Sequence, residues 1–383
     1  MKKKLPALLP VAVFLTMVFG FSLWNLLRPA RSFSENENRA LAQLPQFSLE
    51  SLFAGTFTSD YEEYLTDQFP LRDEWISLKT RAELLLGKKD VNNVYFGKNG
   101  WLLDKYKGTL SEERMQDNLA KLGEFTHYAA GLLGEDHVRA MLVPTASGVL
   151  TNRLPPFASD FDQAAMLAQA EALCPEGTFL SLLPALQEHQ EEYIYYRTDH
   201  HWTTLGAYYA YDQLCQTLGL VPFDRSAHTA VEVENFYGTF YSRARTWNAR
   251  PDVLTYYQLD APLTIYQVTG PGMPGEGQTT GLYDLAKLDA YDKYAAFLHG
   301  NNGLSRVEGE GQGRILVIKD SYANSLVPFL TANYADIDVI DLRNYNYGLD
   351  ALIQENQYDQ ILVLYSFDSF KSDPYLYRAG IEG

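Results

Sequence analysis

Residues 314–334 read RILVIKDSYANSLVPFLTANY, and this stretch decides the fold. A short run of branched apolar residues, typical of a buried strand, passes through a polar turn into a segment with helical spacing. Residues 335–343 (ADIDVIDLR) and 358–367 (YDQILVLYSF) predict two further buried strands, with a helix near 349–356 between them. The alternation predicts an α/β fold with flavodoxin-like layering. Its wound, mostly parallel sheet should have its active edge at the carboxyl ends of the strands.

The remainder of the chain carries weaker patterns on the amino-terminal side of this core. Apolar residues at helical spacing predict helices, and compact or alternating apolar runs predict strands. The expected helices cover 51–65, 71–86, 111–133, 160–173 and 204–218, the expected strands cover 137–146 and 192–197, and a β-hairpin is expected at 92–103. Between 222 and 311 the chain is rich in Tyr, Thr, Gly and Pro with short alternating runs, which predicts a β-rich insertion or irregular lobe.

The composition indicates a globular protein and excludes several classes of function. The chain has 383 residues, 46% hydrophobic and 14% aromatic, with 31 basic and 48 acidic side chains and a net charge of −17. This argues against a disordered, collagen-like or disulfide-dense chain. So acidic a protein repels phosphate backbones, and nucleic acid is not an expected partner. Two cysteines, Cys174 and Cys215, are too few for a disulfide scaffold, and both one bridge and two free thiols stay open.

Residues 5–27 (LPALLPVAVFLTMVFGFSLWNLL) carry no charge over 23 positions. At about 1.5 Å per residue, a helix of this length crosses a hydrocarbon core about 30 Å thick. The preceding MKKK favours a cytoplasmic amino terminus and an extracytoplasmic body. A cleaved signal peptide is the alternative, although its apolar region is usually only about 7–15 residues long. We therefore expect a tail and membrane anchor at 1–28, a linker with lead-in helices at 29–90, and the α/β domain at 91–383.

Two polar stretches carry the chemistry, and the first is TDHHWT at 198–203. Asp199 and His201 are two positions apart, and in an extended backbone this spacing turns both side chains to one face and His200 to the other. A carboxylate so placed orients the imidazole and leaves its second ring nitrogen as a general base. For an isolated D-x-H pair, a structural histidine bonded to its neighbour is the commoner explanation. A metal site made of Asp199, His200 and His201 lacks the further ligands of a closed coordination shell.

The second stretch is KDSYAN at 319–324, where a serine follows an apolar strand and precedes an expected helix. Backbone N–H groups at such a turn can stabilise a developing oxyanion, so Ser321 stands where a nucleophile belongs. The alternative is that Asp320 or Ser321 only caps the helix. Both stretches end strands of one expected sheet, and together they supply serine, histidine and aspartate. We therefore expect a triad of Ser321, His201 and Asp199.

Four stretches together resemble the bacterial DHHW family, which is related to the alginate O-acetylation proteins of the SGNH-hydrolase-like superfamily. They are TDHHWT, KDSYAN, the hairpin sequence GKNGWLL and the lead-in ENRALAQLPQFS, and the resemblance extends over most of residues 33–370. It implies an SGNH-hydrolase-like fold in which a D-x-H-W motif precedes the serine, so that Asp199 and His201 match the motif pair and Ser321 matches the nucleophile. The relatives transfer acetyl groups to extracellular polysaccharide, commonly beside a membrane acyltransferase that exports the acyl group.

The same resemblance bears on the oxyanion hole. Lys319 stands where these relatives usually have glycine. The backbone N–H of Ser321 is the first expected oxyanion donor, and Asn301 is the second. Arg343 and Tyr365, at the ends of the next two expected strands, are candidates to line the site.

Three classes of function stay open. An anchored acyltransferase acting on cell-envelope or secreted polysaccharide is the leading one, an esterase with water as acceptor is the second, and a non-catalytic glycan-binding or assembly protein is the third. The first two differ in how well an acyl-enzyme is shielded from water. We expect neither a cofactor nor a metal, because the expected nucleophile is an alcohol activated by an imidazole.

Overall fold

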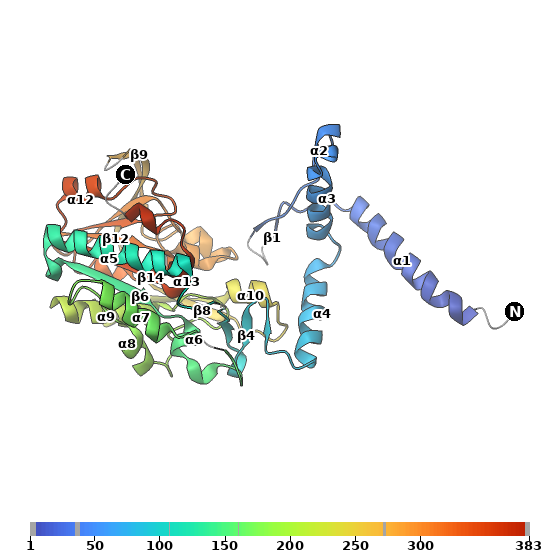
Figure 1. The fold of residues 1–383 in the computed structure, drawn as a ribbon, viewed down its shortest axis with the longest axis horizontal. Helices are drawn as coiled ribbons and strands as arrows, with labels where there is room; N and C mark the ends of the chain where they lie inside the picture. The colour runs from blue at the N-terminus through green and yellow to red at the C-terminus, as the bar shows by residue number, and fades with distance from the viewer. Residues whose placement is uncertain (1–4, 35–38, 107, 160, 271–272, 380–383) are drawn as a thin grey trace. The chain divides into compact units, whose positions relative to one another are not determined.

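The computed structural model describes residues 5–34, 39–106, 108–159, 161–270 and 273–379. The chain divides into two compact units (Figure 1). One comprises the residues up to Val91 together with Ser242–Trp247, and the other comprises Asn92–Tyr241 together with the residues from Asn248 onward. Each unit is described by itself.

The first unit is mainly helical. Helix α1 (Leu5–Leu27) contains a stretch, Leu8–Leu27, that is long and apolar enough to cross a membrane by length and composition. The helix expected at 51–65 is broken at Gly55, whose φ of 79° is left-handed, so that two helices form in its place. The other elements are α2 (Leu49–Phe53), α3 (Thr56–Asp67), α4 (Arg72–Leu85) and the short strands β1 (Phe33–Ser34), β2 (Arg39–Ala40) and β3 (Asp90–Val91).

The second unit is built on a seven-stranded sheet in the order β10-β9-β11-β13-β12-β14-β6. Four strands pair in parallel, namely β13 (Asp336–Ile340), β12 (Arg314–Lys319), β14 (Gln360–Ser366) and β6 (Val138–Val143). Three strands pair antiparallel, namely β11 (Leu304–Glu308), β9 (Pro262–Gly270) and β10 (Met273–Gly281). The α/β class and the parallel strands around β12 are confirmed. The prediction of a mostly parallel sheet is wrong, because the sheet is mixed.

The antiparallel half comes from the segment 222–311, the expected β-rich insertion. Its strands β9, β10 and β11 do not form a separate lobe, because β11 pairs with β13 and continues the central sheet. Antiparallel neighbours need only a short connection, whereas parallel neighbours need a crossover, so short strands can extend a sheet edge without helices between them. Strands β7 (Ala230–Phe236) and β8 (Asp252–Tyr257) form a two-stranded sheet of their own.

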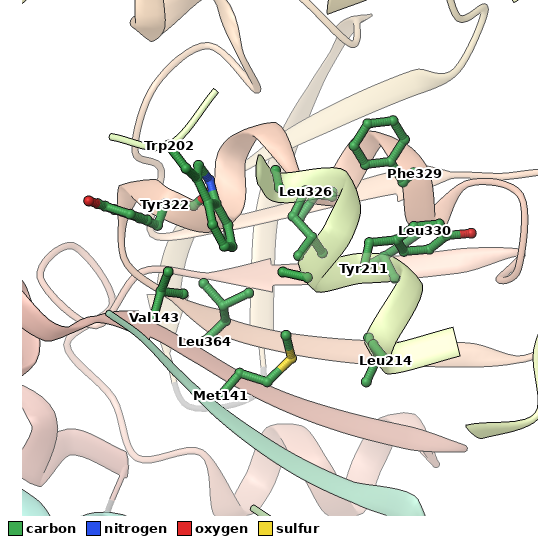
Figure 2. Close-up of a cluster of buried hydrophobic side chains, with 14 of the residues drawn as sticks. Met141, Val143, Trp202, Tyr211, Leu214, Tyr322, Leu326, Phe329, Leu330 and Leu364 are labelled. Carbon is green, nitrogen blue, oxygen red and sulfur yellow. The ribbon is translucent and has the colours of Figure 1, made fainter. Parts of the chain in front are cut away.

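Helices cover both faces of the central sheet and bury two apolar layers. Helix α9 (Thr204–Leu218) packs on one face, and α5 (Glu113–Leu133) and α7 (Gln163–Leu173) pack on the other. Figure 2 draws part of the first layer, where side chains of α9 lie over those of β6 and β14. Along β12, Val317 enters the first layer and Leu316 the second, as expected for alternating side chains of a strand. The buried layers thereby fix the carboxyl ends of the parallel strands.

Most other predicted elements of this unit are confirmed within a few residues. The expected hairpin consists of β4 (Val94–Phe96) and β5 (Leu102–Asp104), which pair antiparallel. The strand expected at 192–197 is wrong, because this segment has only an isolated bridge between Tyr195 and Trp202. Two of its tyrosines, Tyr195 and Tyr196, are buried in the core. The shorter helices are α6 (Ala146–Val149), α8 (Leu183–Glu188), α10 (Thr239–Ala244), α11 (Val327–Leu330), α12 (Asp350–Asn356) and α13 (Phe367–Ser372).

The two cysteines do not form a bridge. Cys174 and Cys215 are both buried, and both thiols are free. Burial raises the pKa of Cys174, and it raises the pKa of Cys215 to about 11. Both side chains therefore stay protonated at neutral pH and act as small apolar groups.

Candidate active site

The serine turn lies at the carboxyl end of β12, where Asp320 and Ser321 follow the strand directly. Asp320 caps the short 3-10 helix Ser321–Ser325, because its Oδ1 accepts from the Tyr322 N–H at 2.9 Å. Its Oδ2 accepts from the N–H and the hydroxyl of Ser366 at the end of β14, at 2.8 and 2.6 Å. Asp320 therefore makes the helix cap, and the partly exposed side chain of Ser321 is left for another contact.

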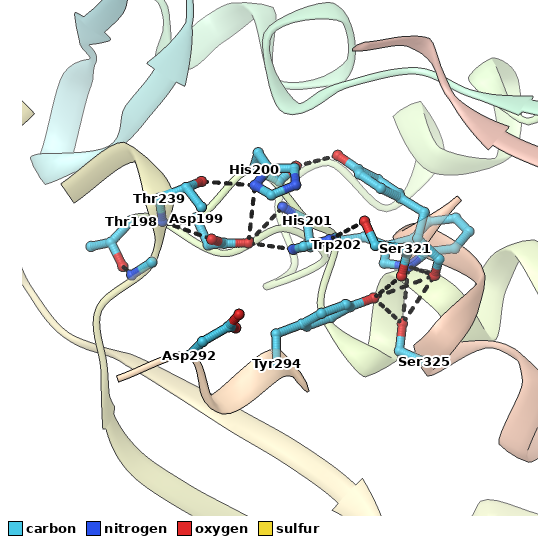
Figure 3. Close-up of polar contacts among 12 residues, drawn as sticks. Thr198, Asp199, His200, His201, Trp202, Thr239, Asp292, Tyr294, Ser321 and Ser325 are labelled. Atoms are coloured by element: carbon cyan, nitrogen blue, oxygen red, sulfur yellow. Dashed lines mark hydrogen bonds and ion pairs between the residues drawn. The ribbon is translucent and has the colours of Figure 1, made fainter. Parts of the chain in front are cut away.

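The turn at 198–202 brings an aspartate and a histidine to this serine (Figure 3). His201 Nδ1 lies 2.6 Å from Asp199 Oδ1, and His201 Nε2 lies 2.8 Å from Ser321 Oγ. An ionised carboxylate only accepts hydrogen bonds, so Nδ1 carries the hydrogen and the Nε2 lone pair of a neutral ring faces the serine hydroxyl. Asp199 is 3% exposed and His201 is 6% exposed. The three side chains thus form one continuous hydrogen-bonded series.

The backbone of residues 198–202 is a turn, and the prediction of an extended backbone there is wrong. Asp199 folds back on the motif, since its Oδ1 also accepts from the His201 N–H at 3.0 Å. His200 does not point away from the site, because its Nδ1 lies 2.7 Å from Thr239 Oγ1 and 3.6 Å from Asp199 Oδ1. Its ring centroid is 3.8 Å from that of His201. Local hydrogen bonding between side chain and backbone, and not strand alternation, brings the pair together.

The charges of this group follow from its burial and close spacing. Burial alone would raise the pKa of Asp199, but His200 and His201 hold it well below its usual range. Burial and the adjacent His200 lower the pKa of His201, although Asp199 opposes the shift. Burial also disfavours the charged form of His200, yet Asp199 raises the pKa of that ring above its usual value. His201 is therefore neutral near pH 7, which is the state that a general base requires.

A carboxylate from β8 fixes the start of the turn. Asp252 is fully buried and accepts from the backbone N–H groups of Arg197 and Thr198, both at 2.8 Å. It also accepts from the Thr198 hydroxyl at 2.6 Å and from the Tyr193 hydroxyl. Sequence reasoning missed Asp252, because an acidic residue at a strand end far along the chain carries no local signal of such a role.

The other side of Asp199 is closed by the backbone at Gly238 and Thr239. The Thr239 N–H donates to Asp199 Oδ2 at 2.8 Å. A Cβ on Gly238 would lie 2.2 Å from Asp199 Oδ2, so only glycine permits this close approach. The signal in the sequence was a single glycine within the segment 222–311, and nothing local distinguished it from the other glycines there.

Two aromatic side chains connect the histidine to the serine turn. The ring of Tyr294 stacks on His201 with centroids 3.7 Å apart and planes at 11°, and its hydroxyl lies 3.1 Å from Ser321 O. Trp202 Nε1 donates to the carbonyl oxygen of Tyr322 at 2.9 Å. The tryptophan of the motif therefore anchors the serine turn. Tyr294, which no sequence signal selected, fixes the plane of the imidazole.

Asn301 is joined to the serine turn through Lys319. The Lys319 side chain is buried, and its Nζ lies 2.7 Å from Asn301 Oδ1, to which Asn324 Nδ2 also donates at 3.2 Å. Burial lowers the pKa of Lys319 to about 8. Two donors on the side-chain oxygen direct the amide nitrogen of Asn301 away from them, and the residue is exposed. In the described part of the chain, no acceptor is bonded to the Ser321 N–H.

Within the described ranges, neither Arg343 nor Tyr365 makes a polar contact with Ser321, His201 or Asp199. Arg343 Nε and Nη2 bind Asp341 at 2.8 and 2.5 Å. Tyr365 is 1% exposed and belongs to the apolar layer under α5. Ion pairing and packing account for the positions of both residues, and their part in substrate binding stays a prediction.

Asp199, His200 and His201 also form a group that could hold a metal ion, since one ligand atom from each lies within 4.8 Å of the others. The 2.6 Å contact between His201 Nδ1 and Asp199 Oδ1 is a hydrogen-bond distance. Two ligands each about 2.1 Å from one tetrahedral zinc ion lie further apart than this. An ion bound to both atoms would break the bond that orients His201, so this donor set fits a hydrogen-bonded pair better than a coordination shell.

Comparison with known proteins assigns the chain to a family. Three solved structures share the fold. A DHHW family protein from Eubacterium siraeum DSM 15702 has 22% sequence identity and a TM-score of 0.59, over 76% of this chain and 95% of that one. Bacillus cereus PatB1 has 19% identity and a TM-score of 0.55, over 71% and 95% of the two chains. PatB1 with a sulfonyl adduct has 20% identity and a TM-score of 0.56, over 74% and 96%.

Identities this low show the fold alone, and none of the curated proteins matches the chain. The family model described as "DHHW protein" matches residues 124–340, which is more than half of the chain. The matched residues include the turn at 198–202 and the serine turn, the two parts that the hydrogen-bonded series joins. The chain belongs to the DHHW family.

Proposed function

We propose that the chain is an acyltransferase, in the simplest case an acetyltransferase, that acts outside the cytoplasm on cell-envelope or secreted polysaccharide. The observation that carries this proposal is the hydrogen-bonded series from Asp199 through His201 to Ser321, whose outer end is partly exposed. A hydroxyl that faces a neutral, oriented imidazole is the arrangement of a serine nucleophile. The resemblance to alginate O-acetylation proteins supports the acetyl group and the class of acceptor.

In the proposed reaction, Ser321 Oγ attacks the carbonyl carbon of an acyl donor while His201 Nε2 takes the hydroxyl proton. Collapse of the tetrahedral intermediate releases the leaving group of the donor with that proton and leaves an acyl ester on Ser321. A sugar hydroxyl then gives its proton to His201 and attacks the ester. The acylated sugar departs as the proton returns to Ser321 Oγ. Asp199 stabilises the imidazolium during both transfers.

We assign the Ser321 N–H and the side-chain amide of Asn301 to the developing oxyanion. Lys319 supports this assignment as a positioning residue, because its Nζ binds Asn301 Oδ1 and so orients the amide. A glycine, which related proteins usually have at this place, makes no such contact. The oxyanion hole of this chain would therefore depend on the Lys319 side chain, whereas related proteins usually have no side chain at this position.

An esterase is the second candidate, and one observation favours it. Ser321 is partly exposed to solvent, so water can reach an acyl ester formed there. Transfer needs a sugar hydroxyl to arrive before water does, whereas hydrolysis needs nothing further. Binding of the polysaccharide next to the ester is what would decide between them.

A transfer assay on the full-length protein in detergent separates these activities. With p-nitrophenyl acetate as donor and an oligosaccharide as acceptor, nitrophenol release reports acylation, and NMR of the acceptor reports transfer. We expect O-acetyl esters on the acceptor with the native chain and none with Ser321→Ala. Free acetate as the sole product with every acceptor would favour the esterase, and no nitrophenol release would favour a binding protein. Activity should survive EDTA, and a loss that zinc or manganese restores would contradict the triad.

We further propose that α1 anchors the protein and that a membrane acyltransferase exporting acyl groups is its partner. The supporting features are the apolar stretch Leu8–Leu27 and the basic residues before it. Alkaline phosphatase fused after Asp60 should be active in cells. Recovery of a soluble mature form that lacks α1 would contradict the anchor and favour a cleaved signal peptide.

A further inference from the structure

A polar cavity of about 210 Å³ lies between the β4–β5 hairpin and the segment that leads into the turn at 198–202. The hairpin carries the sequence GKNGWLL, one of the stretches that resemble the family, and the triad makes no use of it. Three arginines (Arg153, Arg197 and Arg250) line the cavity, together with an aromatic pair and two glutamates, Glu191 and Glu192. A concentration of arginine is unexpected in a chain whose net charge is −17.

Arg197 is held in the cavity by aromatic rings. The carbon of its guanidinium lies 4.5 Å from the centroid of the Tyr193 ring and 5.8 Å from that of Trp101. Its ion-pair contact with Asp252 is at 3.9 Å, which is beyond hydrogen-bond distance. Stacking on rings fixes the plane of a guanidinium while leaving its N–H edge for a ligand. The side chain is therefore placed to present donors to the cavity.

The other two arginines differ in their partners. Arg153 is paired with Glu191 at 2.9 Å. Arg250 is exposed, and no carboxylate of the described residues lies within ion-pair distance of it. The other lining glutamate, Glu192, binds His189 Nδ1 at 2.7 Å. Since Arg153 pairs with Glu191 and Arg197 lies 3.9 Å from Asp252, Arg250 is the lining arginine without a carboxylate partner among the described residues. Its single positive charge suits a ligand with a single negative charge.

We propose that this cavity binds one singly charged, anionic sugar residue of the acceptor polysaccharide. Arg197 and Arg250 bind its negative group. Glu191 accepts hydrogen bonds from its hydroxyls, and the Asn99 side chain donates to them and accepts from them. The volume is below the ~300–1,000 Å³ of pockets for drug-sized ligands, which limits the occupant to one such unit. The choice of a polysaccharide rests on the proposed function, whereas the preference for an anion rests on the cavity itself.

The cavity also shares its supports with the turn that carries Asp199. The N–H of Arg197 and the hydroxyl of Tyr193 both donate to Asp252, the carboxylate that holds Thr198. The carbonyl oxygen of Tyr193 accepts from Thr203 Oγ1 at 2.6 Å, on the other side of the motif. A sugar bound to Arg197 is thus held by the same backbone segment that positions His201.

Calorimetric titration of the full-length Ser321→Ala protein in detergent tests this proposal. Three probes are compared: an oligogalacturonate, the same oligomer with its carboxylates methyl-esterified, and a glycerol phosphate oligomer. We expect the oligogalacturonate to bind about tenfold or more tightly than the esterified oligomer, and its binding to weaken with salt. Binding of the glycerol phosphate oligomer alone, which contains no sugar residue, would overturn the proposal.

Substitutions then locate the binding. Arg250→Gln and Arg197→Gln should each weaken the charged probe about tenfold to a hundredfold. The matched control is Arg225→Gln, because Arg225 stacks on Tyr208 at 4.1 Å outside the cavity and should be without effect. Equal affinity for the charged and esterified probes, or equal affinity of the Arg250→Gln and Arg225→Gln proteins, overturns the proposal. Since Arg250 is exposed, its replacement should not unfold the protein, and because binding is measured without turnover, failure of the triad would leave these results unchanged.

Discussion

The two turns that meet at the candidate active site are built by different means. The serine turn continues a central parallel strand, and Asp320 fixes it to the end of the neighbouring strand β14. The turn at 198–202 belongs to no sheet ladder and is held by residues from distant segments, Asp252, Gly238 and Tyr294 among them. Regular secondary structure thus places the proposed nucleophile, and long-range polar contacts place the proposed base.

This difference predicts two kinds of variant. Changes within the hydrogen-bonded series should remove the chemistry and leave the fold intact. Substitutions of the residues that support the 198–202 turn should leave every reacting group present but displaced. The rate of acyl transfer should then fall further as the displacement of these groups grows. The distinction is wrong if substitutions of the supporting residues lower the rate as much as substitutions of the reacting residues do, or do not lower it at all.

The largest effect is expected for the reacting groups themselves. Ser321→Ala and His201→Ala should each lower acyl transfer on the order of 10⁴-fold or more, because the members of such a unit act together. Steady-state nitrophenol release measures the loss, and thermal unfolding shows whether the fold persists. A residual rate within tenfold of the native one in folded Ser321→Ala protein would contradict a serine nucleophile.

The next effect tests the close approach at Gly238. In Gly238→Ala the added methyl carbon would lie 2.2 Å from Asp199 Oδ2, so the carboxylate must move. A displacement of about 1 Å in a catalytic group costs on the order of a hundredfold in rate. The matched control is Gly131→Ala, in helix α5 with no atom within 4 Å of the added carbon, which should be neutral or slightly stabilising. Equal kinetics for the two variants would show that Asp199 needs no such packing.

A smaller effect is expected at Asp252. In Asp252→Asn one oxygen acceptor becomes an N–H donor facing the donors of the turn, and the free energy of unfolding should fall by about 1–3 kcal/mol. Transfer should fall about tenfold as the turn loosens. Chemical denaturation and kcat measurements check both, with the exposed Asp260→Asn as the control. Unchanged stability would mean that the four hydrogen bonds to Asp252 do not hold the turn.

The smallest effect concerns His200 and is a shift in pH. If His201 is the base, as proposed, the rate should rise with pH through the pKa of that ring, which burial and the adjacent His200 lower below its usual value. Removing a neighbour that repels the added proton makes His201 easier to protonate. The acidic limb of the kcat/KM profile should therefore move to higher pH in His200→Ala, with the plateau reduced by less than tenfold. A profile that stays in place would show that the two rings do not interact.

What the sequence could predict follows the same division. The strand before Ser321 is a local apolar run, and the α/β class, the hairpin at 92–103 and the helices α5 and α9 likewise follow from local periodicity. The contact of Asp199 with His201 was predicted from an extended backbone, but a turn closed by the Asp199 side chain produces it. Local spacing cannot separate these two geometries, because both bring positions two apart to the same side.

The remaining features depend on pairing between segments far apart in the chain. The strands β9, β10 and β11 carry short alternating patterns that predict strands but not the sheet they join, and so the sheet proved mixed. Asp252 and Tyr294 act through contacts with the motif that only the folded chain creates. His200 was expected to face away for the same reason that the backbone was expected to be extended, and both expectations failed together.

The proposed activation of Ser321 by His201 is tested most directly by covalent labelling of the native protein with a sulfonyl fluoride, followed by mass spectrometry of its peptides. A sulfonyl fluoride reacts with an activated hydroxyl, which displaces fluoride and forms a stable sulfonate ester. We predict one adduct, on Ser321, that forms far more slowly in His201→Ala and not at all in Ser321→Ala. Labelling at another residue, or equal labelling of Ser321 with and without the His201 imidazole, would contradict it.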